Sequence, residues 1–267
     1  MPQPTATPAT TILITGATGA IGGALAERYA VPGAHLILHG RRQDTLDALA
    51  QRCREHGASV EVSHADLTQA TALSAWLDAV CAAQVPDIVI ACAGKNTHPT
   101  AACELEPLAD VQALLEINLQ TPIAMAQHLV PRMRARGRGQ LVFISSLAAW
   151  HGLPTSPTYS ASKAGIKAYA EGLRSWLKPC GIGVTVVMPG YVTSPMCQAM
   201  PGPKPWKWAP ERAARVIQRG ISANRARIAF PVWLSLGTHW LAILPAGISQ
   251  WLLRRLGFDR LEETPDD

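Results

Sequence analysis

The stretch from Thr11 to Gly23, TILITGATGAIGG, decides the fold. A short run of β-branched and aliphatic residues leads into Gly16, Gly19 and Gly22, and an amphipathic pattern begins at Ala20. Gly16 permits a tight turn, Gly19 lets the backbone approach a bound group, and Gly22 allows close packing of helix against strand. Unpaired N–H groups at a helix N-terminus favour a phosphate anion. The stretch predicts the strand, turn and helix of a dinucleotide-binding unit, the alternative being a glycine-rich turn without a ligand.

The rest of the chain alternates short β-branched runs with longer amphipathic stretches, as in a parallel sheet covered by helices. Strands are expected at Thr11–Ile14, Ala34–Leu38, Ser59–Ser63, Asp87–Ala91, Gln140–Ile144, Gly183–Met188 and Arg227–Phe230. Helices are expected at Ala20–Ala30, Asp44–His56, Gln69–Ala82, Leu108–Asn118, Thr121–Arg136, Tyr159–Lys178 and Pro210–Arg219. The pattern predicts a single-domain, doubly wound Rossmann fold of the α/β class, with a parallel seven-stranded sheet and helices on both faces. This domain is expected over residues 11–230, after a disordered lead-in over residues 1–10.

Composition excludes several classes of protein. Of the 267 residues, 48% are hydrophobic and 16% are charged, which excludes a disordered chain. The net charge is +5, but the basic residues are scattered, so a nucleic-acid partner is not expected. The six cysteines form no CxxC pair, which predicts no metal site and favours reduced thiols in the cytoplasm. The N-terminus has no signal-peptide pattern, so export is not expected.

The end of the second strand favours NADP as the cofactor. The chain reads Gly40-Arg41-Arg42 where a dinucleotide fold meets the adenosine ribose, and a carboxylate there would select NAD. A guanidinium can bind the ribose 2′-phosphate through several donors, and Arg41 is the better candidate of the two. NAD is the less favoured cofactor. In the alternative reading, the arginines only solvate the start of a helix.

Tyr159 and Lys163 lie four residues apart, so a helix places them on one face, where their ends can converge. A lysine ammonium beside a phenol favours the phenolate, which predicts a lowered pKa for Tyr159 and a role in proton transfer. Ser145 and Ser146 end the preceding strand, on the same sheet edge as the glycine turn. A hydroxyl there could hydrogen-bond a substrate oxygen.

With these motifs, the sequence resembles the short-chain dehydrogenase/reductase family over about residues 11 to 200. The matching motifs are TGATGAIG at 15–22, Asp66 in HADLT, Ala93-Gly94, Asn118 in INL, Ser146 with Tyr159 and Lys163, and Pro189-Gly190. The resemblance implies a catalytic tetrad of Tyr159 as general acid/base, Lys163, Ser146 orienting the substrate oxygen and Asn118 supporting a water-mediated proton relay. Ser146 is preferred over Ser145 because it precedes Tyr159 by the spacing usual in the family.

The glycine turn, the two arginines and the resemblance together give the expected cofactor contacts. They are Gly16, Thr18, Gly19, Ile21, Gly22, Arg41, Arg42, Asp66, Ala93, Gly94, Tyr159, Lys163, Pro189, Gly190, Val192 and Ser194. Three departures stand out: Ala20 replaces a common glycine, Ala91-Cys92 replaces Asn-Asn, and Ser194 replaces a threonine.

A loop rich in Pro, Met and Trp, residues 191–209, follows the sixth strand and is expected to form a lid over the substrate. The expected substrate contacts are Trp150, Tyr191 and Met196, and a small carbonyl or alcohol with an apolar body is the natural guest. The alternative is a proline-stiffened loop that packs on the protein without touching substrate.

Residues 231–267 are expected to form an apolar helical extension. The run from Ile228 to Leu253 contains no Asp, Glu, Lys or Arg, but prolines and glycines divide it into two short helices, Val232–Leu244 and Gly247–Leu256. The alternatives are peripheral contact with the inner membrane surface, a subunit interface or a cover for the substrate pocket; a true membrane span is the least favoured.

The leading hypothesis is an NADP-dependent oxidoreductase that interconverts a ketone and a secondary alcohol by hydride transfer. The alternatives are a cofactor-binding or sensing protein without turnover and an epimerase or dehydratase of the extended branch of the family. The family resemblance implies a homodimer or homotetramer.

Overall fold

The computed structural model describes residues 10–99 and 104–259 and contains one parallel sheet. Its strands are β1 (Thr10–Ile14), β2 (Ala34–His39), β3 (Ser59–Ser63), β4 (Ile88–Ala91), β5 (Gly139–Ile144), β6 (Ile182–Pro189) and β7 (Arg227–Phe230). They lie in the order β3-β2-β1-β4-β5-β6-β7. The order reverses between β1 and β4, and ligands bind at such a switch point in doubly wound folds. The predicted fold class and all seven predicted strands are confirmed.

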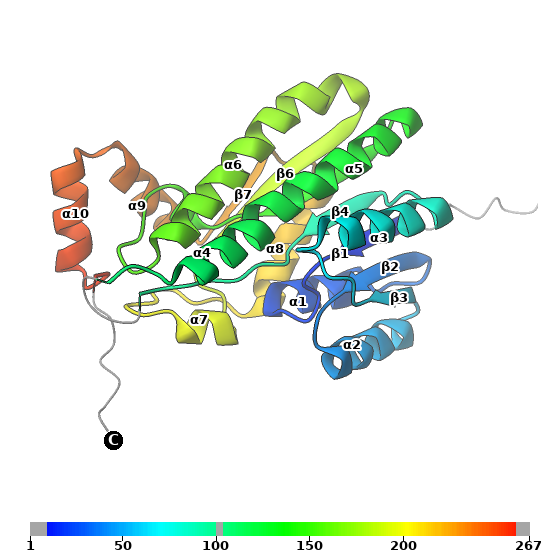
Figure 1. Cartoon of the computed structure of the whole chain (residues 1–267), viewed down its shortest axis with the longest axis horizontal. Helices are drawn as coiled ribbons and strands as arrows, with labels where there is room; N and C mark the ends of the chain where they lie inside the picture. The colour runs from blue at the N-terminus through cyan, green and yellow to red at the C-terminus, as the bar shows by residue number, and fades with distance from the viewer. Residues whose placement is uncertain (1–9, 100–103, 260–267) are drawn as a thin grey trace, which may run out of the picture.

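Helices follow the strands in alternation (Figure 1). Those that build the domain are α1 (Ala20–Tyr29), α2 (Gln43–Glu55), α3 (Ala70–Ala83), α4 (Leu108–Leu115), α5 (Thr121–Arg136), α6 (Pro157–Leu177), α7 (Pro195–Ala199) and α8 (Pro210–Ser222). Two more, α9 (Val232–Ile243) and α10 (Ala246–Arg255), form the C-terminal end and lie at the extremity of the molecule.

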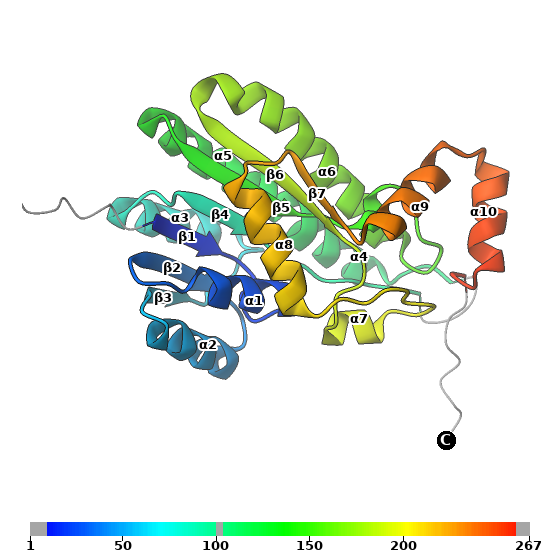
Figure 2. The same ribbon diagram turned by 180° about the vertical axis from the view of Figure 1, so that it is seen from behind.

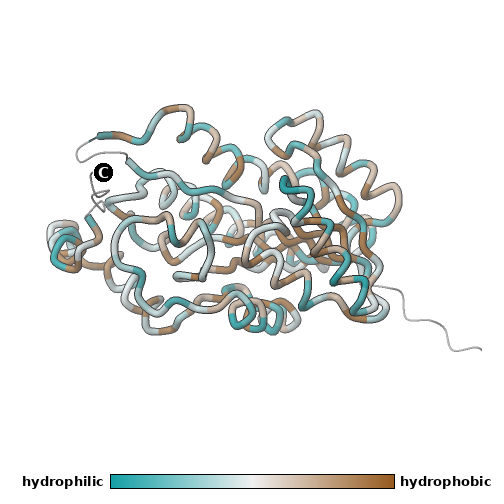
Figure 3. The backbone as a smooth tube through the Cα atoms, turned by 90° about the horizontal axis from the view of Figure 1, so that it is seen from below, coloured by the Kyte–Doolittle hydropathy of each residue, from teal (hydrophilic) through white to brown (hydrophobic). Residues whose placement is uncertain are grey.

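Two hydrophobic cores, one on each face of the sheet, hold these layers together. Successive strand residues point to opposite faces, so Ile12 and Ile14 join the core under α1, α2 and α8, while Leu13 joins the core under α3, α5 and α6. Figures 1 and 2 show these two helical layers from opposite sides. Hydrophobic segments gather inside, and the covering helices alternate hydrophobic with hydrophilic positions (Figure 3).

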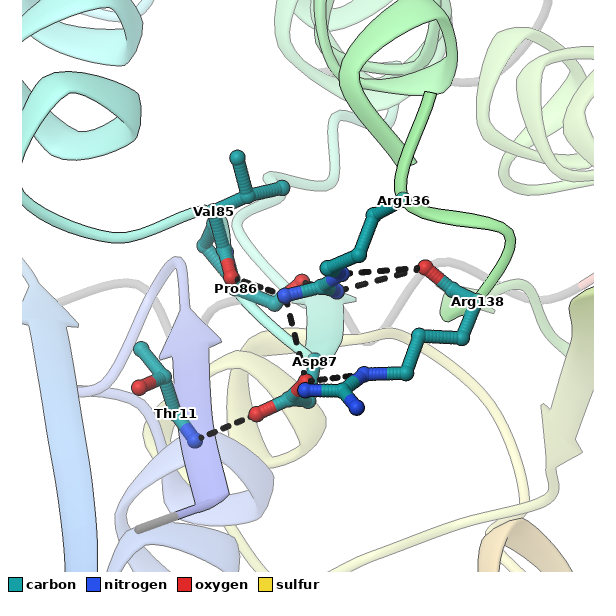
Figure 4. Close-up of polar contacts among 6 residues, drawn as sticks. All are labelled: Thr11, Val85, Pro86, Asp87, Arg136 and Arg138. Carbon is teal, nitrogen blue, oxygen red and sulfur yellow. Dashed lines mark hydrogen bonds and ion pairs between the residues drawn. The ribbon is translucent and has the colours of Figure 1, made fainter. Parts of the chain in front are cut away.

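At the edge of the sheet where the strands begin, Asp87 joins three segments (Figure 4). Its carboxylate accepts a hydrogen bond from the backbone N–H of Thr11 and forms ion pairs with Arg136 and Arg138. The Arg136 guanidinium also donates to the carbonyl oxygens of Val85 and Pro86. Asp87 and Arg136 are largely buried, so these bonds satisfy charges that would otherwise be costly to bury. This cluster ties β1, β4 and the end of α5 together, leaving the opposite edge for the site.

Most elements begin or end one to three residues from the predicted boundaries, and three differences need comment. Thr10 already belongs to β1, whereas residues 1–9 of the expected lead-in lie outside the described residues. The helix expected to continue to Asn118 ends at Leu115 and gives way to a π-helical turn, Glu116–Gln120. Within the expected lid, Pro195–Ala199 forms a short helix that the pattern did not predict.

Candidate active site

The glycine turn connects β1 to α1 with the geometry that its spacing predicts. Gly16 has a φ of +67°, and a Cβ atom there would lie 2.7 Å from the Ala93 Cα. A Cβ on Gly22 would lie 2.3 Å from the Gly16 carbonyl oxygen. Both positions therefore exclude larger residues. Gly19 is the N-cap of α1 and provides no side-chain cap, and the first turn holds no acidic residue. The helix therefore presents N–H groups and a positive dipole end to the cavity.

The loop after β2 carries the two arginines. The Arg42 guanidinium donates a hydrogen bond to the Thr18 carbonyl oxygen, which fixes this arginine against the glycine turn. Arg41 lines the same cavity with an exposed side chain. Asp66 lies across from them after β3, where hydrogen bonds from Thr68 lower the pKa of its carboxyl group. The structure thus brings Arg41, Arg42 and Asp66 to one end of the cavity.

The end of β4 is fastened to the glycine turn by Thr15. Its buried hydroxyl accepts hydrogen bonds from the backbone N–H groups of Cys92 and Ala93, at 3.1 and 3.2 Å. These bonds link the two strands at the switch point, where the sequence lacks two asparagines common in the family. Gly94 follows, and a Cβ there would lie 2.8 Å from the Asn118 Oδ1.

Asn118 is buried in the π-helical turn between α4 and α5. Its amide accepts a hydrogen bond from the backbone N–H of Lys95 and donates one to the carbonyl oxygen of the same residue, both at 2.9 Å. It also donates to the Ser162 hydroxyl on α6 at 3.2 Å. Asn118 therefore fixes the chain after Gly94 against the helix that carries Tyr159, and it does not itself line the cavity.

The two serines after β5 have different partners. The buried Ser145 hydroxyl donates a hydrogen bond to the Lys163 carbonyl oxygen at 2.7 Å and so joins strand to helix. The Ser146 hydroxyl hydrogen-bonds the Tyr159 side chain inside the cavity and accepts a bond from the Ala148 N–H. Ser146 is thus the serine whose hydroxyl lies beside the Tyr159 phenol.

Tyr159 and Lys163 both line the cavity from the first turns of α6. The Lys163 ammonium lies 5.6 Å from the centre of the Tyr159 ring and donates a hydrogen bond to the Ile144 carbonyl oxygen at 3.0 Å. Burial lowers the pKa of Lys163 to about 8. Burial also raises the pKa of Tyr159, opposing the smaller lowering effect of the Ser146 hydrogen bond. The expectation of a lowered Tyr159 pKa was therefore wrong for this geometry, because desolvation dominates.

Glu106 supports the site without lining the cavity, and sequence reasoning missed this role. Its largely buried carboxylate accepts hydrogen bonds from the backbone N–H and the hydroxyl of Thr158, at the start of α6. Thr158 directly precedes Tyr159. The partners lie 52 residues apart, so no local pattern reveals the contact.

The chain after β6 folds over the cavity as a closed loop. Val192 pairs with Trp208, and the Thr193 N–H donates to the Trp208 carbonyl oxygen at 2.9 Å. Ser194 caps α7 by accepting a hydrogen bond from the Cys197 N–H at 3.0 Å. Its place before Pro195 is a helix-start signal that could have revealed α7. The Pro189 carbonyl oxygen lies 3.5 Å from the Ser146 hydroxyl, so the loop begins beside the serine.

Tyr191 and Met196 line the cavity, as expected of substrate contacts, and burial raises the pKa of Tyr191 to about 12. Trp150 does not line it, which corrects the prediction of a substrate contact there. A short turn after Ser146 carries the Trp150 ring away from the cavity, against His239 and the cationic groups of Lys167 and Arg227.

One cavity of about 1950 Å³ contains these groups. It runs from the glycine turn and Arg41, past Gly94, Tyr159 and Lys163, to the loop after β6 and the inner faces of α9 and α10. From the C-terminal helices the contributing residues are Trp233, Leu234, Gly237, Thr238, Leu241, Leu252, Leu253 and Leu256. The part near Tyr159 is therefore walled by apolar side chains. Within residues 10–99 and 104–259, no cluster of His, Cys, Asp or Glu could hold a metal ion.

Comparison with known proteins agrees with this arrangement. A family model described as short chain dehydrogenase matches residues 10–203. An uncharacterized oxidoreductase of Myxococcus xanthus is 33% identical over 92% of this chain and 97% of its own length. An 11-beta-hydroxysteroid dehydrogenase A of Sesamum indicum is 29% identical over 91% of this chain and 74% of its own length. The chain belongs to the short-chain dehydrogenase family and is an oxidoreductase acting on CH–OH or C=O groups.

A solved structure supports the same assignment. The short-chain dehydrogenase from Sphingobium yanoikuyae in complex with NADPH shares 26% sequence identity and superposes with a TM-score of 0.77. The alignment covers 97% of this chain and 99% of that chain, so the likeness includes the C-terminal part of the molecule.

Proposed function

We propose that the protein is an NADP-dependent oxidoreductase that interconverts a bulky apolar ketone and its secondary alcohol, with Tyr159 as the general acid/base. The observation that carries the proposal is that Ser146, Tyr159 and Lys163 line the same cavity as the glycine turn. A proton donor, a second hydroxyl and a place for a dinucleotide thus share one cavity.

The residues present fit NADP. Gly16 and Gly22 let the turn pack closely against Ala93 and the start of α1, and this uncapped helix start lines the cavity where a pyrophosphate would bind. Arg41 would bind the 2′-phosphate, while Arg42, held on Thr18, shapes the loop beside it. The solved relative from Sphingobium yanoikuyae, a complex with NADPH, supports this choice over NAD. Asp66, Ala93, Val192 and Ser194 are the further contacts that the resemblance implies.

When bound, the reduced nicotinamide supplies a hydride to the carbonyl carbon, and the oxidised form accepts it in the reverse direction. Tyr159 donates its phenolic proton to the carbonyl oxygen while the Ser146 hydroxyl hydrogen-bonds that oxygen. Because burial raises the pKa of Tyr159, its phenol is protonated at neutral pH, the form that carbonyl reduction needs. Once the proton has left, the Lys163 ammonium stabilises the phenolate, and Asn118 fixes the backbone beside it.

The apolar side chains that line the cavity indicate the class of substrate. Leu147, Leu153, Tyr191 and Met196 line the same cavity as Tyr159 and as the leucines of α9 and α10. Such a wall favours a large apolar body attached to one carbonyl or hydroxyl group, because burial of apolar surface supplies binding energy while the two hydroxyls fix the orientation.

The test is a screen of bulky apolar ketones and alcohols with NADPH and NADP, following nicotinamide absorbance, repeated with Tyr159→Phe. Turnover by the parent should fall by at least ~10²-fold in the variant while NADPH affinity is unchanged. A variant with near-parent turnover would exclude Tyr159 as the acid/base. Cofactor binding without turnover of any compound would favour the alternative of a non-catalytic cofactor-sensing protein.

The expected homodimer or homotetramer stays a prediction.

A further inference from the structure

The two C-terminal helices expose an unusual amount of apolar surface. None of the twelve residues of α9 is buried, although most of them are apolar. The large hydrophobic side chains of this region that are exposed to solvent are Val232, Trp233, Leu236, Trp240, Ile243, Ile248, Trp251 and Leu256. The Trp240 and Trp251 side chains are 61% and 60% exposed. Many large apolar side chains exposed on two neighbouring helices indicate a binding surface.

These helices have two apolar faces with separate surroundings. The inner face, with Leu234 and Leu241 on α9, lines the cavity. This contact with the cavity explains why the inner face is apolar. The outer side chains of Leu236, Trp240 and Ile243 recur at helical spacing but do not line the cavity. Covering the cavity requires only the inner face, so the outer face needs another occupant. We call the outer residues Leu236, Trp240, Ile243, Ile248 and Trp251 the outer apolar face.

The charged residues next to the outer apolar face are basic. No Asp or Glu occurs from Ile228 to Phe258, and the exposed Arg254 and Arg255 end α10. The first carboxylate after them is Asp259, at the end of the described chain. Basic residues beside exposed tryptophans suit the boundary between an anionic headgroup layer and the acyl chains.

Within the described part of the chain, no helix is long and apolar enough to cross a membrane. The short helices α9 and α10, joined at Leu244 and Pro245, project from the end of the molecule (Figures 1 and 2). This arrangement suits a segment that lies on a membrane surface with one face in the headgroup region.

We propose that the outer apolar face docks on an anionic lipid surface, with Arg254 and Arg255 contacting the headgroups. A second copy of the chain fits less well. A two-fold contact brings the same patch against itself, so it would place the arginine pairs of both copies in one interface whose α9 and α10 segments hold no carboxylate. Lipid phosphates neutralise the same arginines.

Vesicle sedimentation tests the proposal without any need for turnover, so its outcome is independent of the proposed function. The full chain should sediment with vesicles of phosphatidylcholine mixed with phosphatidylglycerol and much less with phosphatidylcholine alone. The double variant Trp240→Glu/Trp251→Glu should bind at least ~10-fold more weakly, because two large apolar side chains no longer enter the lipid. Arg254→Gln and Arg255→Gln should each weaken binding to the anionic vesicles roughly 5-fold.

The matched control is Trp176→Glu, which removes a tryptophan that is 80% exposed on α6, away from this face. It should bind vesicles as the parent does. Circular dichroism checks that all variants are folded. Absence of sedimentation with anionic vesicles, or binding that survives the double Trp variant, would overturn the proposal. A dimer that dissociates in that double variant, together with no vesicle binding, would assign the face to subunit contact instead.

Discussion

The carboxylate of Glu106 accepts a hydrogen bond from the backbone N–H of Thr158 at 3.2 Å and a second one from the Thr158 hydroxyl. Thr158 lies in the first turn of α6, whose N-cap residue, Ser156, makes no side-chain cap bond. A distant acidic residue thus takes the place of the local cap. A negative charge at a helix N-terminus also interacts favourably with the helix dipole. Glu106 therefore fixes the turn that presents Tyr159.

We expect Glu106→Ala to lower the free energy of unfolding by about 1–3 kcal/mol, since a buried donor at the helix start loses its acceptor. Glu106→Gln keeps an acceptor oxygen at a similar position and should lower the free energy of unfolding by less than Glu106→Ala does. Urea denaturation monitored by circular dichroism measures both. Equal stability of Glu106→Ala and the parent would mean that water replaces the carboxylate without loss.

Replacing Arg41 by Ala should weaken NADPH binding by ~1.5–3 kcal/mol and leave NADH binding nearly unchanged, because only NADPH carries the 2′-phosphate. Fluorescence titration with both cofactors measures the two affinities. Arg42→Ala is the comparison variant: because the Arg42 guanidinium is held on the Thr18 carbonyl oxygen, its loss should affect NADPH and NADH binding alike. Equal affinity of the parent for NADPH and NADH would contradict the assignment of Arg41.

The adjacent serines offer a matched pair of variants. Ser146→Ala should lower turnover by ~10²-fold, because a hydroxyl beside the reacting oxygen is lost. Ser145→Ala removes the hydrogen bond to the Lys163 carbonyl oxygen and should lower the free energy of unfolding by about 0.5–1.5 kcal/mol, with a smaller effect on turnover. Steady-state kinetics measures turnover in both variants, and urea denaturation measures their free energies of unfolding. A larger loss of turnover in Ser145→Ala would exchange the two roles.

Stability should depend on pH through Lys163. The pKa of this lysine is lowered to about 8 in the folded chain, so between about pH 8 and its ordinary pKa near 10.5 the unfolded chain binds more protons. The destabilisation is fully present below pH 8 and is relieved as the pH rises through this window. Relative to Lys163→Met, the parent should therefore gain roughly 3 kcal/mol between pH 7 and pH 10.5. Urea denaturation at both pH values measures the difference, and a constant difference would contradict the burial of a charged lysine.

Much of the fold could be predicted because helices cover both faces of the sheet, so central strands such as β4 are apolar and are bounded by turn residues, whereas the edge strand β3 alternates polar and apolar residues. The irregular π-helical turn at Glu116–Gln120 could not, because the hydrophobic pattern continues across it. Its geometry depends on the hydrogen bonds of Asn118 to Lys95, a contact between segments distant in sequence.

The candidate site divides in the same way. Residues whose roles depend on local geometry, such as Gly16 in its left-handed conformation, follow from the spacing of the motif. Residues whose roles depend on distant partners do not. Nothing near Glu106 indicates Thr158, and the sequence does not show that the Trp150 ring packs on His239 outside the cavity lining. The direction of the Tyr159 pKa shift also required burial, which the sequence does not give.

The π-helical turn holds one residue more per turn than an α-helix would need in the same place. Deleting one residue between Leu115 and Asn118 would allow α4 to run into α5 as a single regular helix, and the side chain of Asn118 would rotate by about 100° around the helix axis. The backbone of Lys95 would then lose both of its hydrogen bonds to the Asn118 side-chain amide. Protein engineers often stabilise a chain by shortening a loop or making a helix more regular. Here a more regular helix would remove the hydrogen bonds between Asn118 and Lys95 beside the candidate site. In an alignment of relatives, a one-residue gap in this segment should therefore mark chains that keep the fold but lack catalytic activity.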